Sequence, residues 1–224
     1  AGISAESGIS TFRDADGLWE GHDVMEVASP HGWEKNQELV LDFYNQRRRQ
    51  LKVVHPNPAH FALAKLEDKF EVTVITQNVD NLHEKAGSTK IIHLHGELNK
   101  VRSTGNNKLV YEWTDDLNLG DVCEQGHQLR PHIVWFGEMV PMLESAVVEC
   151  QKGEIFIIIG TSMQVYPAAS LIAYAPSNSK IFYIDPKPNI SFELSRLPNL
   201  RVIQEKATIG VIELTDLLMN GAKD

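Results

Sequence analysis

Two groups of polar residues are the part of this chain best suited to chemistry. His95 stands in the run His93-Leu94-His95-Gly96, and the run Thr76-Gln77-Asn78-Val79-Asp80 supplies two amides and a carboxylate. A neutral imidazole can take a proton near pH 7, so His95 is a candidate general base. Taken alone, His95 would more often be a core histidine held by a backbone carbonyl.

The chain opens with small residues that are suited to holding phosphate groups. The segment Ala1-Gly2-Ile3-Ser4-Ala5-Glu6-Ser7-Gly8-Ile9 contains glycines, whose backbone amides can approach a pyrophosphate without a Cβ in the way. Glycine and serine also form ordinary turns, so this segment alone is a weak indication. The continuation from Thr11 through Arg13 to Trp19 strengthens it. Because the sequence starts at Ala1 without a Met, we expect it to be cut at the edge of this loop.

Five short apolar runs are the strands expected to position these residues. They are nearly all apolar rather than alternating, which is typical of strands covered on both faces. Helical patterns at about 37–51, after the Asn57-Pro58 cap, and at about 211–219 imply a parallel α/β sheet. The five runs are residues 72–75, 90–92, 155–159, 181–184 and 201–203.

Polar residues directly follow four of these runs. Residues 76–80 follow the first run, 93–96 the second, Gly160-Thr161-Ser162 the third, and Asp185 the fourth. In open α/β sheets, ligands bind at the carboxyl ends of the strands, so we expect these residues to share one crevice. Each group taken alone could equally be a helix cap or a turn.

Two stretches interrupt the alternation of strands and helices. Residues 17–54 form a long, mostly helical segment without a strand of its own, and residues 97–131 are polar and poorly periodic. Within the second stretch, the alternation of Leu109, Tyr111 and Trp113 predicts a hairpin strand. We interpret both as insertions that together form a smaller lobe. The predicted fold is α/β: a Rossmann-like parallel sheet with helices on both faces plus this inserted lobe, in a single domain spanning 1–224.

Charge and cysteine content exclude several classes of protein. The formal net charge of −9 repels phosphate backbones, so no nucleic-acid partner is expected. The longest apolar run, residues 155–159, is far too short to cross a bilayer, so no membrane partner is expected. Only two cysteines occur, Cys123 and Cys150, which argues against a disulfide framework and predicts a cytoplasmic protein.

Together these motifs resemble the sirtuins, the NAD-dependent protein lysine deacylases. The resemblance rests on five ordered blocks that span nearly the whole chain: residues 1–13, 76–83, 93–96, 134–138 and 160–162. The family's opening motif has one more Gly before the position of Ala1, which this chain lacks. The resemblance implies an enzyme that consumes NAD to remove acyl groups from lysine side chains of proteins, giving nicotinamide, 2′-O-acyl-ADP-ribose and free lysine.

The resemblance also assigns roles to individual residues. His95 matches the general base, Phe12 and Arg13 match a loop that closes over the nicotinamide end, and Asp185 stands where sirtuins commonly have Asn. The residues expected to bind NAD are Ala1, Gly2, Ile3, Ala5, Glu6, Thr11, Phe12, Arg13, Trp19, Gln77, Asn78, Val79, Asp80, His95, Gly160, Thr161, Ser162, Asp185, Pro186, Lys187 and Ala207.

A second set of residues is expected to bind the acylated lysine. Tyr44 and Arg47 lie three positions apart on a predicted helix, so they share a face, and a hydroxyl plus a guanidinium fork can hold a carboxylate. The pair resembles the Tyr-x-x-Arg signature of class III sirtuins, which prefer succinyl, malonyl or glutaryl lysine, while many bacterial members also remove acetyl. The alternative is that residues 47–49, all Arg, form a solvated basic face. The other expected substrate residues are Ala15, Val134, Phe136, Gly137, Glu138 and Val165, of which Val134, Gly137 and Glu138 match a segment that pairs with the peptide as an added strand.

The chain departs from the family at its metal site. Sirtuins usually hold a structural zinc with four cysteines that lie between the blocks matching residues 93–96 and 134–138. Here only Cys123 remains in that interval, Ser103 stands where a first ligand is expected, and His127 would give only a second ligand, so we predict no bound metal.

Two other functions remain open. The loss of the zinc ligands allows a catalytically silent NAD or ADP-ribose binding module. A hydride-transferring oxidoreductase is a third possibility, although the opening glycines lack the Gly-x-Gly-x-x-Gly spacing of such enzymes.

Overall fold

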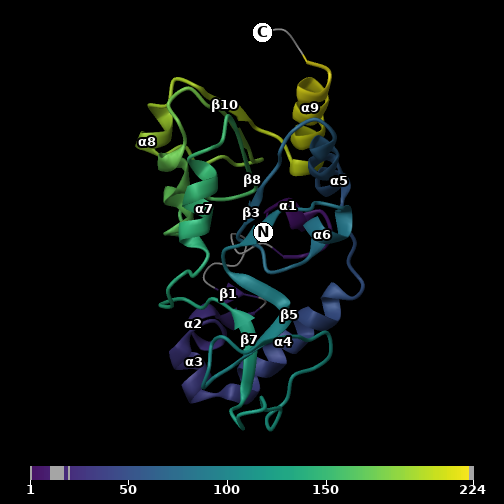
Figure 1. Cartoon of the computed structure of the whole chain (residues 1–224), viewed down its shortest axis with the longest axis vertical. Helices are drawn as coiled ribbons and strands as arrows, with labels where there is room; N and C mark the ends of the chain where they lie inside the picture. Colours follow the sequence, from purple (N-terminus) through teal and green to yellow (C-terminus); the bar gives the residue numbers. More distant parts are fainter. Residues whose placement is uncertain (1, 11–17, 20, 222–224) are drawn as a thin grey trace.

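The computed structural model describes residues 2–10, 18–19 and 21–221 of the 224-residue chain, with the backbone alone for Leu18, Trp19 and Glu193. Figure 1 shows two groups of elements along the long axis of the molecule. One end holds the parallel strands with α5, α7 and α9, and the other end holds α2 to α4 with β5 and β7. No helix of the described residues is long and apolar enough to cross a membrane.

All five predicted parallel strands are present. They form two hydrogen-bonded groups: β3 (Val74–Thr76) pairs with β4 (Ile91–His93), and β9 (Lys180–Ile184) lies between β8 (Ile155–Ile159) and β10 (Leu200–Ile203). In register, Val74 faces Ile91, and Ile155 faces Lys180. Every pairing in these two groups is parallel. Within the described residues no ladder joins β3 to β8, and the strand residues of β8 are only half-buried.

Helices cover these strands where the sequence predicts them. The N-terminal helix α1 spans Gly2–Ala5, and η2 (Leu66–Asp68) follows α5 (Pro58–Lys65), which packs on α9 (Ala207–Met219). Their apolar faces form one core with Ile3, Phe182 and Ile184. A second core joins α7 (Leu143–Cys150) and η3 (Ala168–Tyr174) to β4, and the short helices α6 (Leu82–Ala86) and α8 (Phe192–Ser195) complete this end.

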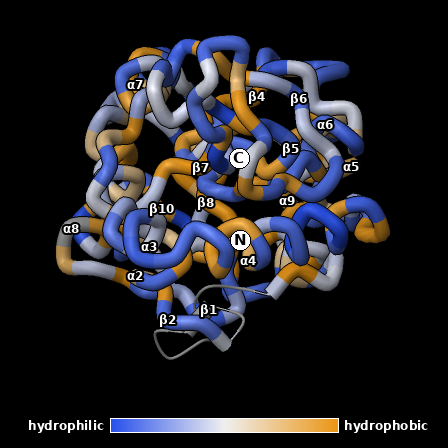
Figure 2. Tube along the Cα trace, turned by 90° about the horizontal axis from the view of Figure 1, so that it is seen from below, coloured by the Kyte–Doolittle hydropathy of each residue, from blue (hydrophilic) through white to orange (hydrophobic). Residues whose placement is uncertain are grey.

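The segments predicted to form the smaller lobe share a separate hydrophobic core. Helices α2 (Val24–Val27), α3 (Pro30–Lys35) and α4 (Gln37–Leu51) pack against an antiparallel sheet with the order β6-β5-β7. The strands are β5 (Gly96–Ser103), β6 (Val110–Glu112) and β7 (Leu129–Ile133). In Figure 2 the hydrophobic stretches near β7 and β8 lie toward the middle of the view, and hydrophilic chain predominates in the outer loops.

Two features of this lobe differ from the prediction. The first stretch does contain strand, because β1 (Leu18–Trp19) and β2 (His22–Asp23) form a hairpin beside Gly21, whose φ is +83°. Two-residue strands are too short to show alternation in the sequence. The eight-residue β5 and its partner β7 were also missed, because their register shifts between Gly96 and Val101 and the side chains of β5 do not alternate regularly.

Candidate active site

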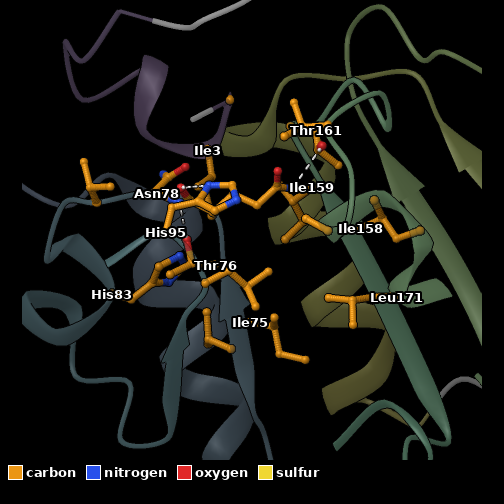
Figure 3. Close-up of a pocket in the computed structure, with 18 of the residues that line it drawn as sticks. Ile3, Ile75, Thr76, Asn78, His83, His95, Ile158, Ile159, Thr161 and Leu171 are labelled. Carbon is orange, nitrogen blue, oxygen red and sulfur yellow. Dashed lines mark hydrogen bonds between the residues drawn. The ribbon is translucent and has the colours of Figure 1, made fainter. Parts of the chain in front are cut away.

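One cavity of about 1630 Å³ runs between β3 and β8 along the length of both strands and includes the residues that follow their carboxyl ends (Figure 3). Every residue with a described side chain that the sequence assigns to NAD or to the acylated lysine lines it. These residues are Gly2, Ile3, Ala5, Glu6, Tyr44, Arg47, Gln77, Asn78, Val79, Asp80, His95, Val134, Phe136, Gly137, Glu138, Gly160, Thr161, Ser162, Val165, Asp185, Pro186, Lys187 and Ala207. The predictions for Ala1, Thr11, Phe12, Arg13 and Ala15, and for the side chain of Trp19, lie outside the described residues.

His95 follows β4 and faces the cavity beside Asn78 (Figure 3). Its Nδ1 lies 3.1 Å from the carbonyl oxygen of Gln77. A carbonyl can only accept, so Nδ1 carries the proton and Nε2 keeps its lone pair. Burial lowers the pKa of His95 below its usual range, although the Gln77 carbonyl works in the opposite direction. His95 is therefore a neutral imidazole at pH 7, as a general base must be.

Asn78 is held by a buried chain of polar groups that the sequence did not reveal. Its amide nitrogen Nδ2 donates to Ser4 Oγ at 2.8 Å, and His60 Nε2 lies 3.4 Å from the same oxygen. Nδ1 of His60 accepts from the backbone N–H of Asn57 at 3.2 Å. Burial lowers the pKa of His60 to about 4, which keeps the ring neutral and lets Nε2 donate to Ser4. Ser4 and His60 are completely buried.

The same Asn57 joins helix α5 to helix α1. Its Oδ1 accepts from Ala59 N–H at 3.0 Å as the helix cap, while Nδ2 donates to the carbonyl of Ile3 at 2.7 Å. The Asn57-Pro58 motif signalled the cap but not this long-range contact. The remaining sequence signal was Ser4, which lies within the opening motif without an assigned role.

The segment expected to be a phosphate-binding loop begins instead with helix α1, and its first residue meets the end of β8 without side chains between them. Gly2 N–H donates to the carbonyl of Gly160 at 3.0 Å, and a Cβ on Gly2 would lie 2.4 Å from Gly160 Cα. Gly160 has φ +57°, a conformation that favours glycine. The two glycines therefore allow these backbone segments to pack directly on each other at the border of the cavity.

Some of the predicted NAD residues also have structural partners within the protein. The carboxylate of Glu6 accepts from the N–H and hydroxyl of Thr208 at 3.1 and 2.8 Å, so it caps α9. Asp185 Oδ1 accepts from Lys187 N–H at 2.7 Å, and Asp80 Oδ1 from Leu82 N–H at 3.1 Å. The caps and turns that were the alternative for single strand ends are therefore present, and the same residues line the cavity.

Tyr44 and Arg47 lie on α4 and line the same cavity. Tyr44 is completely buried, and its hydroxyl accepts from Trp135 Nε1 at 3.0 Å. The guanidinium of Arg47 stacks 3.5 Å from the centroid of the Phe43 ring and donates to the Phe43 carbonyl at 2.6 Å.

The three consecutive arginines do not form one solvated face. Arg48 is 1% exposed and donates to the Leu98 carbonyl at 3.0 Å, whereas Arg49 pairs with Asp116 at 2.7 Å near the surface. Burial lowers the pKa of Arg48 to about 10. Successive helix residues are rotated by 100°, which separates Arg47 from both neighbours.

The segment 134–138 runs from His95 to the end of α2. Val134 N–H donates to the carbonyl of His95 at 2.9 Å, and Phe136 N–H to that of Ala28 at 2.9 Å. The carboxylate of Glu138 is anchored from three sides: by Arg130 Nη1 at 2.7 Å, by Arg102 Nη2 at 3.0 Å and by Trp135 N–H at 2.8 Å. Glu138 thus fixes the shape of this segment.

The residues at the family's zinc position do not fit a zinc ion. The Cys123 thiol donates to Ser103 Oγ at 3.3 Å, and Ser103 Oγ in turn accepts from the N–H groups of Gly105 and Asn106, both at 3.2 Å. A structural zinc site needs four ligands. Among the residues with described side chains, the one cluster of three possible metal ligands is Glu84, His93 and Glu97, elsewhere in the structure.

Comparison with known proteins identifies close relatives. Residues 1–167 match the Sir2 family. An NAD-dependent protein deacylase of Helicobacter pylori (strain ATCC 700392 / 26695) is 59% identical over 99% of this chain and 96% of its own length. A protein of the same name from Bacteroides thetaiotaomicron is 52% identical over 98% of this chain and 95% of its own.

Solved structures agree with these relatives. A Sir2 homologue in complex with NAD superposes with a TM-score of 0.87 at 38% identity, covering 99% of this chain and 87% of that one. An ADP-ribose complex of a Sir2 homologue gives a TM-score of 0.87 at 37% identity, covering 99% and 90%.

Proposed function

From the premise that this chain belongs to the Sir2 family, we propose that it is an NAD-dependent protein deacylase that prefers acyl groups ending in a carboxylate. The observation that carries the proposal is the meeting of His95, Asn78 and Gly160 at one cavity, with Tyr44 and Arg47 on its wall. The family and the relatives support the deacylase activity, and α4 supports the choice of acyl group.

NAD would occupy the cavity with its phosphates beside Gly2 and Gly160 and its nicotinamide ribose beside Asn78 and Asp80. Gly2 and Gly160 carry no side chains into this border of the cavity, although their own N–H groups are bonded to the carbonyls of Gly160 and Ile184, so the phosphates would be bound by neighbouring groups. The Ser4 and His60 chain holds the Asn78 amide in one orientation, so its remaining donor and its oxygen are available to a ligand. When bound, NAD supplies a ribose carbon that accepts the acyl oxygen as nicotinamide leaves.

His95 acts as the general base of the reaction. The Gln77 carbonyl holds the proton on Nδ1, so Nε2 is the nitrogen that takes a proton from a ribose hydroxyl. Burial lowers the pKa of His95, which keeps it unprotonated at neutral pH. The alternative for His95 was a core histidine held by a backbone carbonyl. That carbonyl contact is present, and it fixes the tautomer in which Nε2 can accept a proton.

The acyl group enters between α4 and the segment 134–138. Tyr44 offers a hydroxyl and Arg47 a guanidinium at positions i and i+3 of one helix face. Arg47 would turn from the Phe43 carbonyl to a substrate carboxylate, exchanging a neutral acceptor for a charged one, which forms a stronger hydrogen bond. The acylated lysine belongs to a protein substrate whose backbone would pair along Val134 and Gly137.

The proposed function involves no structural zinc, nucleic acid or membrane. Because Cys123 and Ser103 bond to each other, we infer that the lobe around β5 and β6 holds no zinc and is stabilised by its own packing. We also propose a cytoplasmic location without nucleic-acid or membrane partners, supported by the two free cysteines and the net charge of −9.

The decisive experiment compares products from succinyl-, malonyl- and acetyl-lysine peptides with NAD by mass spectrometry. We expect nicotinamide and 2′-O-acyl-ADP-ribose from all three, with higher kcat/KM for the two acidic acyl groups. Arg47→Met should lower succinyl-lysine turnover about 10- to 100-fold more than acetyl-lysine turnover, because only the former leaves a carboxylate without its partner. Equal losses on both substrates would refute the role of Arg47.

His95→Ala separates the enzyme from a silent binding module. The variant should bind NAD but form no 2′-O-acyl-ADP-ribose, whereas a parent protein that binds NAD and releases no nicotinamide would be a silent module. Reduced nicotinamide absorbs near-ultraviolet light, and the appearance of that absorbance would indicate hydride transfer instead.

A further inference from the structure

A buried indole nitrogen connects the substrate segment to the acyl pocket. Trp135 is 2% exposed and lies between Val134 and Phe136, while Tyr44 is 0% exposed and lies on α4. Trp135 Nε1 and Tyr44 Oη are 3.0 Å apart. An indole N–H can only donate, so the Tyr44 oxygen is the acceptor and the hydroxyl hydrogen of Tyr44 is directed away from Trp135.

We propose that Trp135 is a positioning residue for acyl selectivity: its indole N–H orients the Tyr44 hydroxyl so that the hydroxyl donates to the carboxylate end of the acyl group. This inference rests on the proposed function and names the residue that prepares its selector. Tyr44 and Arg47 both line the cavity, so a hydroxyl hydrogen directed to that side meets the same carboxylate as the guanidinium.

Tyr44 stays a donor at every pH at which the enzyme works. Burial raises the pKa of Tyr44 well above its usual range, and this outweighs the opposing hydrogen bond from Trp135 and the charges of Arg130 and Arg47. A phenolate could only accept and would repel a carboxylate. The burial that encloses Tyr44 therefore preserves the proton that the proposed contact needs.

Trp135 is itself held in one orientation. The guanidinium of Arg130 stacks 3.2 Å from the centroid of its ring, and the ring of Trp33 lies 5.7 Å away, tilted by 38°. Arg130 and the backbone N–H of Trp135 both bond to the Glu138 carboxylate. Because the ring is packed and its backbone is anchored, the Nε1–H direction is set before any substrate arrives.

The arrangement couples two parts of substrate recognition. Val134 and Gly137 belong to the segment proposed to pair with the peptide backbone, and Trp135 extends from that segment to the acyl selector. A substrate that engages the segment thus meets a hydroxyl that is already aligned. The aligned Tyr44 hydroxyl strengthens binding only of acyl groups that end in a hydrogen-bond acceptor, so it should not affect the binding of acetyl-lysine.

The test measures the ratio of kcat/KM for succinyl-lysine to that for acetyl-lysine peptide. Trp135→Phe keeps a ring beneath Arg130 and removes the N–H, and we expect it to lower the ratio about tenfold, equal to about 1.4 kcal/mol, mainly through a higher KM for the succinyl peptide. Trp113→Phe removes an indole N–H that donates to the Asp116 carbonyl outside the cavity lining, and it should leave the ratio unchanged. A variant with β-(3-benzothienyl)alanine at position 135 retains the shape of Trp without the N–H and should reproduce the loss without a packing defect.

A double-mutant cycle separates positioning from packing. In the Tyr44→Phe background, Trp135→Phe should have no further effect on the ratio, because the hydroxyl on which it acts is gone. Additive effects, or a ratio unaffected by the benzothienyl variant, would overturn the inference while leaving a wild-type succinyl preference intact. A wild-type protein without any succinyl preference would overturn the proposed selectivity and this inference together.

Discussion

Neutralising the Glu138 carboxylate should destabilise the protein far more than neutralising a carboxylate on its surface. The Glu138 side chain is 21% exposed, and those of Arg102 and Arg130, which pair with it at 3.0 and 2.7 Å, are each 10% exposed. Burial lowers the pKa of Arg130 to about 10, which still leaves it charged at neutral pH. Glu138→Gln therefore leaves two largely buried guanidinium groups without a counter-charge.

The expected magnitude follows from this burial. Removing one partner of a buried ion pair costs about 3–5 kcal/mol of stability, and the glutamine oxygen can still accept one or two of the bonds, so we expect a loss of about 2–3 kcal/mol. For a chain of this length that corresponds to a decrease in Tm of roughly 5–10 °C. Glu34→Gln, on the exposed face of α3, is the matched control and should change the Tm by less than about 2 °C.

The stabilising effect of Glu138 should decrease as the pH is lowered. Burial opposes ionisation of Glu138, but the hydrogen bonds from Arg130 and the Trp135 amide dominate and hold the pKa of Glu138 below its usual range. Stability from this group is present above the unfolded pKa of about 4.3 and is lost as the pH falls through the lower folded value. Thermal melts of both variants and the wild type at pH 7 and in acid are the assay. A Glu138→Gln protein that melts like Glu34→Gln at pH 7, or a difference that grows on acidification, would refute the reasoning.

Three further predictions concern the cavity and the lobe. Because burial lowers the pKa of His95, the acid limb of the kcat/KM profile should lie below the ordinary histidine value of about 6.5, and a midpoint above that value would contradict a buried neutral base. Asn57→Ala should cost about 1–2 kcal/mol of stability by loss of the cap and should also raise the KM for NAD through loss of the contact to Ile3, whereas Asn36→Ala, which removes the cap of α4, should lower stability alone. A chelator should leave the Tm unchanged and elemental analysis should find substoichiometric zinc, since Cys123 bonds to Ser103; a chelator-dependent decrease in Tm would show a metal site.

The sequence predicted those parts of the site that depend on local patterns. Apolar runs placed β3, β4, β8, β9 and β10, and the polar residues after them do line a shared cavity. The prediction worked because the carboxyl ends of parallel strands must meet at one edge, whatever loops follow. Helix α4 was also predicted to its ends, since Asn36 caps it and its apolar residues recur with helical spacing.

The contacts that orient the site could not be predicted, because they join residues far apart in the sequence. Asn57 reaches Ile3, and Trp135 reaches Tyr44 across 91 positions. Each partner has an ordinary local explanation, a helix cap or a buried aromatic, so nothing in its own neighbourhood indicates the second role. The three arginines 47–49 show the converse: one charged run in the sequence divides into a cavity residue, a buried residue and a surface ion pair, because a helix turns each of them to a different environment.

The sequence alone does not distinguish His93 from His95 as the candidate base, and only their contacts in the structure do so. His93 and His95 lie two positions apart and bond through Nδ1 to the adjacent carbonyls of Asn78 and Gln77, at 3.3 and 3.1 Å. Burial alone would lower the pKa of both rings. In His93 the hydrogen bond from Nε2 to Glu84 at 2.6 Å outweighs burial, so the pKa is raised. In His95 the hydrogen bond to the Gln77 carbonyl does not outweigh burial, so the pKa is lowered. The Glu84 carboxylate thus favours the charged form of His93, whereas among the described residues no carboxylate bonds to His95, whose neutral form suits the proposed base.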